Sequence, residues 1–148
     1  MTLAISRCID QIVAIQRGLR ITSPVELQTA NAVRYTLEAG LPDTPLWANT
    51  WKLPRLSESA GNREANFTVV MSCYAEDSDP DLAAQIATAF WEVAMDEFAK
   101  HTTLNGTCQL AQVIARDNGP HVARVTGRTL LGVTILLDVL IQDFPTYG

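Results

Sequence analysis

Few side chains in this sequence combine a reactive type with a spacing that could support catalysis. The two histidines are His101, at the end of a predicted helix, and His121, in a predicted turn. A cysteine nucleophile would need a histidine beside Cys73 or Cys108. Both cysteines fall in apolar patterns that predict strands, where a thiol is usually inert. The sequence therefore predicts no nucleophile–histidine pair.

Three aspartates, Asp77, Asp79 and Asp81, alternate in a pattern that superficially resembles a calcium loop. Such a loop needs glycine at its sixth position and glutamate at its twelfth, which here are Leu82 and Thr88. Helix capping explains the aspartates better, because a carboxylate accepts hydrogen bonds from free N–H groups of the first turn. Glycine-rich phosphate loops, nucleophile elbows and zinc spacings are also absent from the sequence. We therefore expect no metal, no cofactor and no enzyme.

Compartment signals in the sequence favour a reducing environment. The cysteines are odd in number, and Cys8, Cys73 and Cys108 show no paired spacing, which is typical of buried thiols rather than a disulfide framework. We find no signal peptide at the N-terminus. The most apolar run, Leu130 to Ile141, is too short for a membrane helix and contains Asp138. These features predict a soluble protein of cytosolic origin.

Composition limits the classes of partner. Hydrophobic residues make up 47% of the chain and charged residues only 18%, which predicts apolar surface in contact with other chains. The net charge of −5, with eleven scattered Lys and Arg residues, argues against a nucleic-acid-binding surface. A length of 148 residues fits one domain, 1–148, and we find no repeat or linker.

The element that organises the chain is a helix from Ser78 to Ala99. Asp79 is suited to cap it and Pro80 to occupy its first position, and its apolar residues recur at helical spacing. Residues 23–40 are compatible with a helix or, in part, a strand, and 56–66 with a loop or a long hairpin. The remaining predicted elements are a helix at Leu3–Leu19 and strands at Phe67–Tyr74, Cys108–Ala115 and Thr126–Ile141. Together they predict an α+β domain, mainly an antiparallel sheet flanked by an N-terminal and a central amphipathic helix.

Two further features allow two interpretations each. Trp47 and Trp51 lie in a proline-broken segment where alternation puts both indoles on one side, either in the core or on a binding surface. Asp138 interrupts an apolar strand pattern. It fits a sheet edge or a subunit contact that faces an arginine such as Arg124 or Arg128.

The order of these elements resembles the tail terminator (tail completion) proteins of long-tailed bacteriophages. The resemblance covers nearly the whole chain and is carried by the order, length and composition of four segments: FTVVMSCYAED, DLAAQIATAFWEVAMDEF, LNGTCQ and GRTLLGVTILLDVLI. It implies a virion protein, assembled in the host cytoplasm, that forms a six-fold ring. The ring would cap the tail tube protein, end its polymerisation and bind the head-completion (stopper) protein, while DNA passes through the lumen.

Two alternatives stay open beside this resemblance. One is another neck or head–tail connector component. The other is a cytosolic α+β domain that binds a small ligand, or an enzyme, with Trp47 and Trp51 lining a pocket. For the ring we expect contacts through the strand-rich C-terminal half and the loop around Arg63. The candidate interface residues are Trp47, Trp51, Arg63, Glu64, Arg124, Arg128 and Asp138.

Overall fold

A computed structural model describes residues 3–26, 28–35, 43–59, 61–114, 119–125 and 127–145. Its element order confirms the predicted α+β class, with an N-terminal and a central helix. In chain order the elements are α1 (Ala4–Gly18), β1 (Arg20–Ile21), β2 (Gln28–Thr29), β3 (Asn31–Val33), β4 (Leu46–Trp51), β5 (Arg55–Ser59), β6 (Asn62–Ala75), α2 (Pro80–Lys100), β7 (Leu110–Ile114), β8 (His121–Val125) and β9 (Arg128–Ile141).

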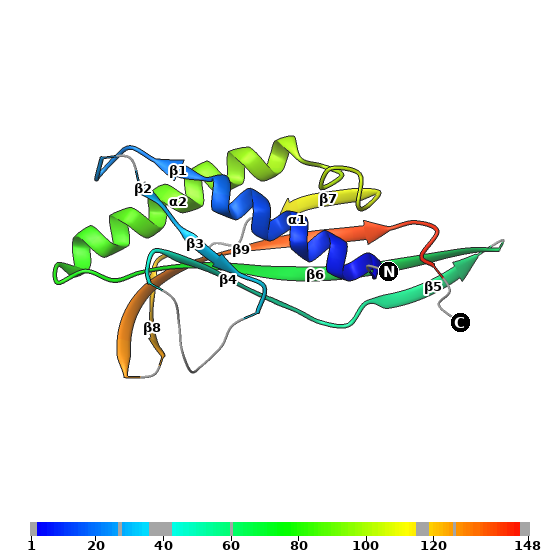
Figure 1. The fold of residues 1–148 in the computed structure, drawn as a ribbon. Coiled ribbons are helices and arrows are strands. Elements are labelled where there is room, and N and C mark those ends of the chain that lie inside the picture. The colour runs from blue at the N-terminus through cyan, green and yellow to red at the C-terminus, as the bar shows by residue number, and fades with distance from the viewer. Residues whose placement is uncertain are drawn as a thin grey trace.

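One mixed sheet holds seven of these strands, in the order β3-β4-β6-β9-β7, with β5 added to β6 and β8 added to β9. All its pairs are antiparallel except β3–β4. Both helices lie over the same face of this sheet (Figure 1), and β1 and β2 form a separate small sheet. The sheet therefore has a helix-covered face and a helix-free face.

The centre of the sheet is the antiparallel pair β6–β9, paired from Ala65–Ile141 to Ala75–Leu131. Side chains alternate along each strand, so paired residues such as Met71 and Ile135 point to the same face. That face is fully apolar and packs against the helices. The register thus gives the core its continuous apolar surface.

Helix α2 begins as the sequence predicts. The Asp79 carboxylate accepts a hydrogen bond from the Asp81 N–H at 3.0 Å, and the Asp77 carboxylate accepts one from the Asp79 N–H at 2.9 Å. These bonds satisfy donors that the first turn would otherwise leave free. Its buried face consists of small and aromatic residues, Ala83, Ile86, Ala87, Phe90, Ala94 and Phe98. Alanines at this spacing let the helix approach the sheet closely.

Other segments differ from prediction in position or type. Helix α1 matches the predicted helix within a residue, but a helix at 23–40 is wrong for 28–29 and 31–33, which are short strands. Residues 36–40 lie outside the described residues. Of the two options for 56–66, the hairpin is confirmed, with Gly61 at φ +80° in its turn. Cys108 precedes β7 instead of lying in it, and His121 begins β8 instead of lying in a turn.

A buried amide pair joins helix α1 to the sheet. Gln16 Nε2 donates to Asn49 Oδ1 at 2.7 Å, and Asn49 Nδ2 donates to Gln16 Oε1 at 2.9 Å. Asn49 Nδ2 also donates to the Val33 carbonyl oxygen at 2.8 Å. Both side chains are fully buried, so the bonds between them offset the cost of removing two amides from water. The pair fixes α1 against β4 and β3.

Replacing both amides should therefore lower the free energy of unfolding by less than the sum of the two single replacements. Gln16→Leu and Asn49→Leu each leave the other buried amide without its side-chain hydrogen-bond partner. Each should lower the free energy of unfolding by about 1–3 kcal/mol. The double variant should lose about 1 kcal/mol less than the sum of the single variants. Urea unfolding measures all three, with the exposed Gln85→Leu as a control within about 0.5 kcal/mol of the unmodified protein. Strict additivity would show that the two amides do not depend on each other.

Candidate interaction surfaces

The two tryptophans of β4 both point to the helix-covered face, but they differ in burial. Trp47 is fully buried, pairs in register with Cys73 and belongs to the core, so it is not available to a partner or a ligand. Its indole Nε1 has no hydrogen-bond partner within the described part of the chain. Trp51 is half-buried, and its ring meets that of Tyr35 edge-on, with centroids 5.9 Å apart. The core interpretation is thus correct for Trp47, while Trp51 reaches the rim.

The predicted interface residues Arg63 and Glu64 lie in the β5–β6 hairpin, which extends past the helices at one end of the molecule (Figure 1). Arg63 Nε is 3.7 Å from Glu58 Oε1 across the hairpin, and the Arg63 guanidinium carbon is 5.7 Å from the centre of the Phe144 ring. The Phe144 N–H donates to the Arg63 carbonyl oxygen at 2.6 Å. The segment after β9 therefore contacts the hairpin close to its turn.

Asp138 is not at a sheet edge, because its strand lies between β6 and β7. Thr68 Oγ1 donates to Asp138 Oδ1 at 2.6 Å, which supplies the polar partner that a half-buried carboxylate needs. Arg128 is ten residues away along β9, about 33 Å at the usual rise of an extended strand. Within one chain, then, neither Arg128 nor the neighbouring Arg124 can be the partner of Asp138.

The partner of Arg128 is Glu76. Arg128 Nη2 donates to Glu76 Oε1 at 3.0 Å and Arg128 Nε donates to Glu76 Oε2 at 3.3 Å, a two-pronged contact. This pair ties the start of β9 to the residue that follows β6. The guanidinium lowers the pKa of the Glu76 carboxyl below its ordinary value. Arg124, on β8, is exposed.

Large exposed apolar side chains gather on the two edges of the sheet. Apart from Leu3 at the start of α1, those of the described residues fall into two groups. The β5 edge, formed by β3, β5 and the adjoining chain, exposes Tyr35, Leu53 and Leu56. The β7 edge, formed by β7 and β8, exposes Leu110, Ile114 and Val122. Leu53 is 87% exposed and Val122 is 64% exposed, so these side chains point into solvent and are not partly covered residues at the margin of the core. The central strands β6 and β9 separate the two edges.

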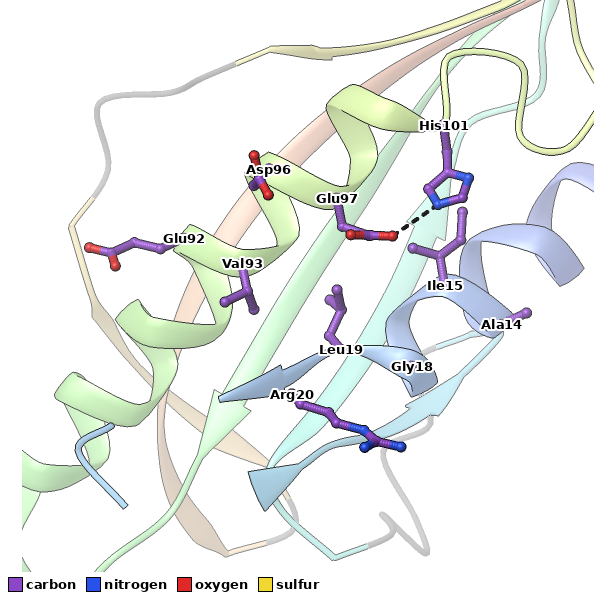
Figure 2. Close-up of a pocket in the computed structure, with 10 residues that line it drawn as sticks. All are labelled: Ala14, Ile15, Gly18, Leu19, Arg20, Glu92, Val93, Asp96, Glu97 and His101. Carbon is purple, nitrogen blue, oxygen red and sulfur yellow. Dashed lines mark hydrogen bonds and ion pairs between the residues drawn. The ribbon is translucent and has the colours of Figure 1, made fainter. Parts of the chain in front are cut away.

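A groove of about 510 Å³ lies between the end of α1 and the outer side of α2 (Figure 2). Glu92, Asp96, Glu97 and His101 line it from α2, opposite Arg20. His101 Nε2 lies 3.0 Å from Glu97 Oε1, and Lys100 Nζ lies 3.1 Å from Asp96 Oδ2. These charges are paired along one helix, and among the described residues no cluster suited to a metal ion is present. The groove thus combines charged residues with the apolar side chains of Ile15, Leu19 and Val93, and its lining includes no cysteine or serine.

Comparisons with known proteins assign no family. A scan against models of known protein families finds no match, and a search of curated proteins finds no significant relative. In the described part of the chain, no helix has the length and apolar character needed to cross a membrane.

The Arg128–Glu76 pair makes a pH-dependent prediction. The pKa of Glu76 is lower in the folded state than in the unfolded state. The pair therefore stabilises the protein at pH values above the unfolded-state pKa of glutamate, and this stabilisation is lost as the pH falls through the folded-state pKa. Arg128→Gln should raise the pKa of Glu76 to its ordinary range. A carboxyl NMR titration of Glu76 measures this, with the exposed Arg124→Gln as the matched control that leaves it unchanged. An ordinary Glu76 pKa in the unmodified protein would refute the pairing.

Proposed function

We propose that this chain is a structural protein that assembles head-to-tail into a ring, and that the ring caps the tail tube of a long-tailed bacteriophage. The observation that carries the ring is the presence of exposed apolar side chains on both the β5 edge and the β7 edge. A head-to-tail contact joins two different surfaces of neighbouring copies, and it closes into a ring when the rotation between copies permits. Two separate apolar edges on one chain meet that requirement.

The energetics favour covering these edges. An exposed sheet edge offers unpaired N–H and C=O groups, and apolar side chains on it add a further gain when water is excluded. Leu56 on one edge and Leu110 on the other are both close to half exposed. Contact between the β5 edge of one copy and the β7 edge of the next would remove both from water. The polar β5–β6 hairpin, with Arg63 and Glu64, would then lie at the border of that contact.

The tail-terminator role rests on the resemblance in element order described above. The structure has the helix, extended segment, strand, helix and strands in that order, which supports the resemblance. The net charge of −5 is compatible with a lumen through which DNA passes without tight binding to its phosphates. On this proposal the ring ends polymerisation of the tail tube protein and presents a surface to the stopper protein.

The ring is tested by light scattering together with negative-stain images of the same fraction. We expect hexamers or rings of similar size for the unmodified protein. Leu110→Lys should reduce the assembly to monomers, because it places a charge in the apolar contact. Thr88→Lys, on the exposed side of α2, is the matched control and should leave the ring intact. A closed symmetric dimer that survives Leu110→Lys would overturn the proposal.

The position in the particle is tested separately with polymerising tail tube protein. A terminator should stop tube growth and be seen at one tube end in negative-stain images. Rings that leave tube length unchanged but bind a head-side neck protein would assign the chain to another connector. Leu110→Lys, as a variant that cannot form the ring, should lose either effect.

A further inference from the structure

The fold brings together two cysteines that lie far apart in the sequence. Cys8, in the second turn of α1, is fully buried, and its thiol donates a hydrogen bond to the Thr107 carbonyl oxygen with Sγ and O 3.4 Å apart. Cys108 is the next residue, is half-buried and packs against the same core. The backbone N–H of Cys108 is held by the Thr103 carbonyl oxygen at 3.2 Å. Both thiols are therefore fixed at one contact between α1 and the turn before β7.

The Thr107 carbonyl oxygen that accepts from the Cys8 thiol belongs to the residue joined to Cys108, so the two cysteines meet at this point of the fold. Hydrogen bonding from the Cys108 thiol is the main cause that lowers the pKa of Cys8 to about 7; burial opposes it, and Thr107 and Arg7 lower the pKa by smaller amounts. The same contact raises the pKa of Cys108, because Cys8 takes the negative charge first. Cys73 differs: it lies fully buried in β6, and burial raises its pKa above the ordinary value. A thiolate at neutral pH is thus favoured at the Cys8–Cys108 contact and disfavoured at Cys73.

Cys108 also faces a groove. A cavity of about 430 Å³ is lined by Arg7, Thr107, Cys108 and Asp143, among others. It gives a small molecule access to the Cys108 side of the pair, while Cys8 remains behind it in the core. Arg7 places a positive charge at the groove and Asp143 a negative one, which suits a zwitterionic ligand that carries both carboxylates and an amine.

We propose that Cys8 and Cys108 form a reversible redox pair, which a low-molecular-weight disulfide of the glutathione type oxidises to an internal disulfide. The arrangement of one accessible sulfur in front of one buried sulfur sets the order of events. This inference does not depend on the proposed ring.

The reaction balances as two thiol–disulfide exchanges. The Cys8 thiolate takes the proton of the Cys108 thiol, and the Cys108 sulfur then attacks one sulfur of the small disulfide, so that a mixed disulfide forms and one small thiolate leaves. That departing thiolate takes the proton from Cys8, whose thiolate then attacks the Cys108 sulfur, and the bond to the second small thiol breaks. The protons lost by the two protein thiols are taken up by the two departing thiolates. Two protein thiols are oxidised, and one small disulfide is reduced to two thiols.

The experiment uses the full chain, folded, incubated with oxidised glutathione and then alkylated with iodoacetamide before mass spectrometry. We expect the intact mass to fall by two hydrogen atoms and a peptide map to join Cys8 to Cys108, with dithiothreitol reversing both. Cys73 should be alkylated only after unfolding. A chain in which Cys8 and Cys108 stay unlinked at equilibrium with excess oxidised glutathione would overturn the proposal.

Three variants assign the roles. Cys8→Ser should stop at a stable glutathione adduct on Cys108, since the resolving thiol is missing, and Cys108→Ser should form no adduct in the same time. Cys73→Ala is the matched control and should form the disulfide at an unchanged rate. An adduct on Cys8 in the Cys108→Ser protein, formed as fast as that on Cys108, would refute the assigned order. Because the peptide map of the unmodified protein stands alone, a variant that fails to fold does not remove the test.

Discussion

The pairing of β6 with β9 is the constraint on which the rest of the structure depends. Both strands span fourteen residues, and every other strand of the main sheet attaches to one of them or to a strand beside them. A shift of the register by one residue would turn the apolar set that includes Met71 and Ile135 away from the helices. Helix α2 connects β6 to the other flank of the pair and covers that set, so the core and the topology share one cause.

The length of this central pair also explains why the sheet has two similar edges. The neighbouring strands are about a third as long, so each flank carries two of them, β4 with β5 on one side and β7 with β8 on the other. Each edge is thus short and interrupted, which limits unspecific strand pairing. The apolar side chains exposed there, such as Leu56 and Leu110, favour contacts with another surface. The shape of these side chains, and not backbone pairing, would then select the partner.

Local signals predicted the elements whose residues repeat with a clear period. Helix α2 has a cap at Asp79 and an uninterrupted apolar face, and β6 and β9 have β-branched residues over long runs. The strands between 28 and 33 carried no such signal, because two or three residues show no period and their pairing is decided by other strands, β1 for β2 and β4 for β3. The prediction that Asp138 lies at a sheet edge was wrong for a related reason. The order of strands in a sheet is a tertiary property, and Thr68, the hydrogen-bond partner of Asp138, is distant in sequence.

The two polar contacts in the core were open to prediction to different degrees. Gln16 falls on the apolar face of its helix and Asn49 between two inward tryptophans, so a local signal for two buried amides was present in the sequence, although we did not use it. Nothing comparable marks Cys8 and Cys108, because thiols are ordinary core residues. Their meeting follows from α1 packing beside the turn that α2 leads into, and that packing depends on the sheet beneath both helices. A site built from such a contact is visible only once the fold is known.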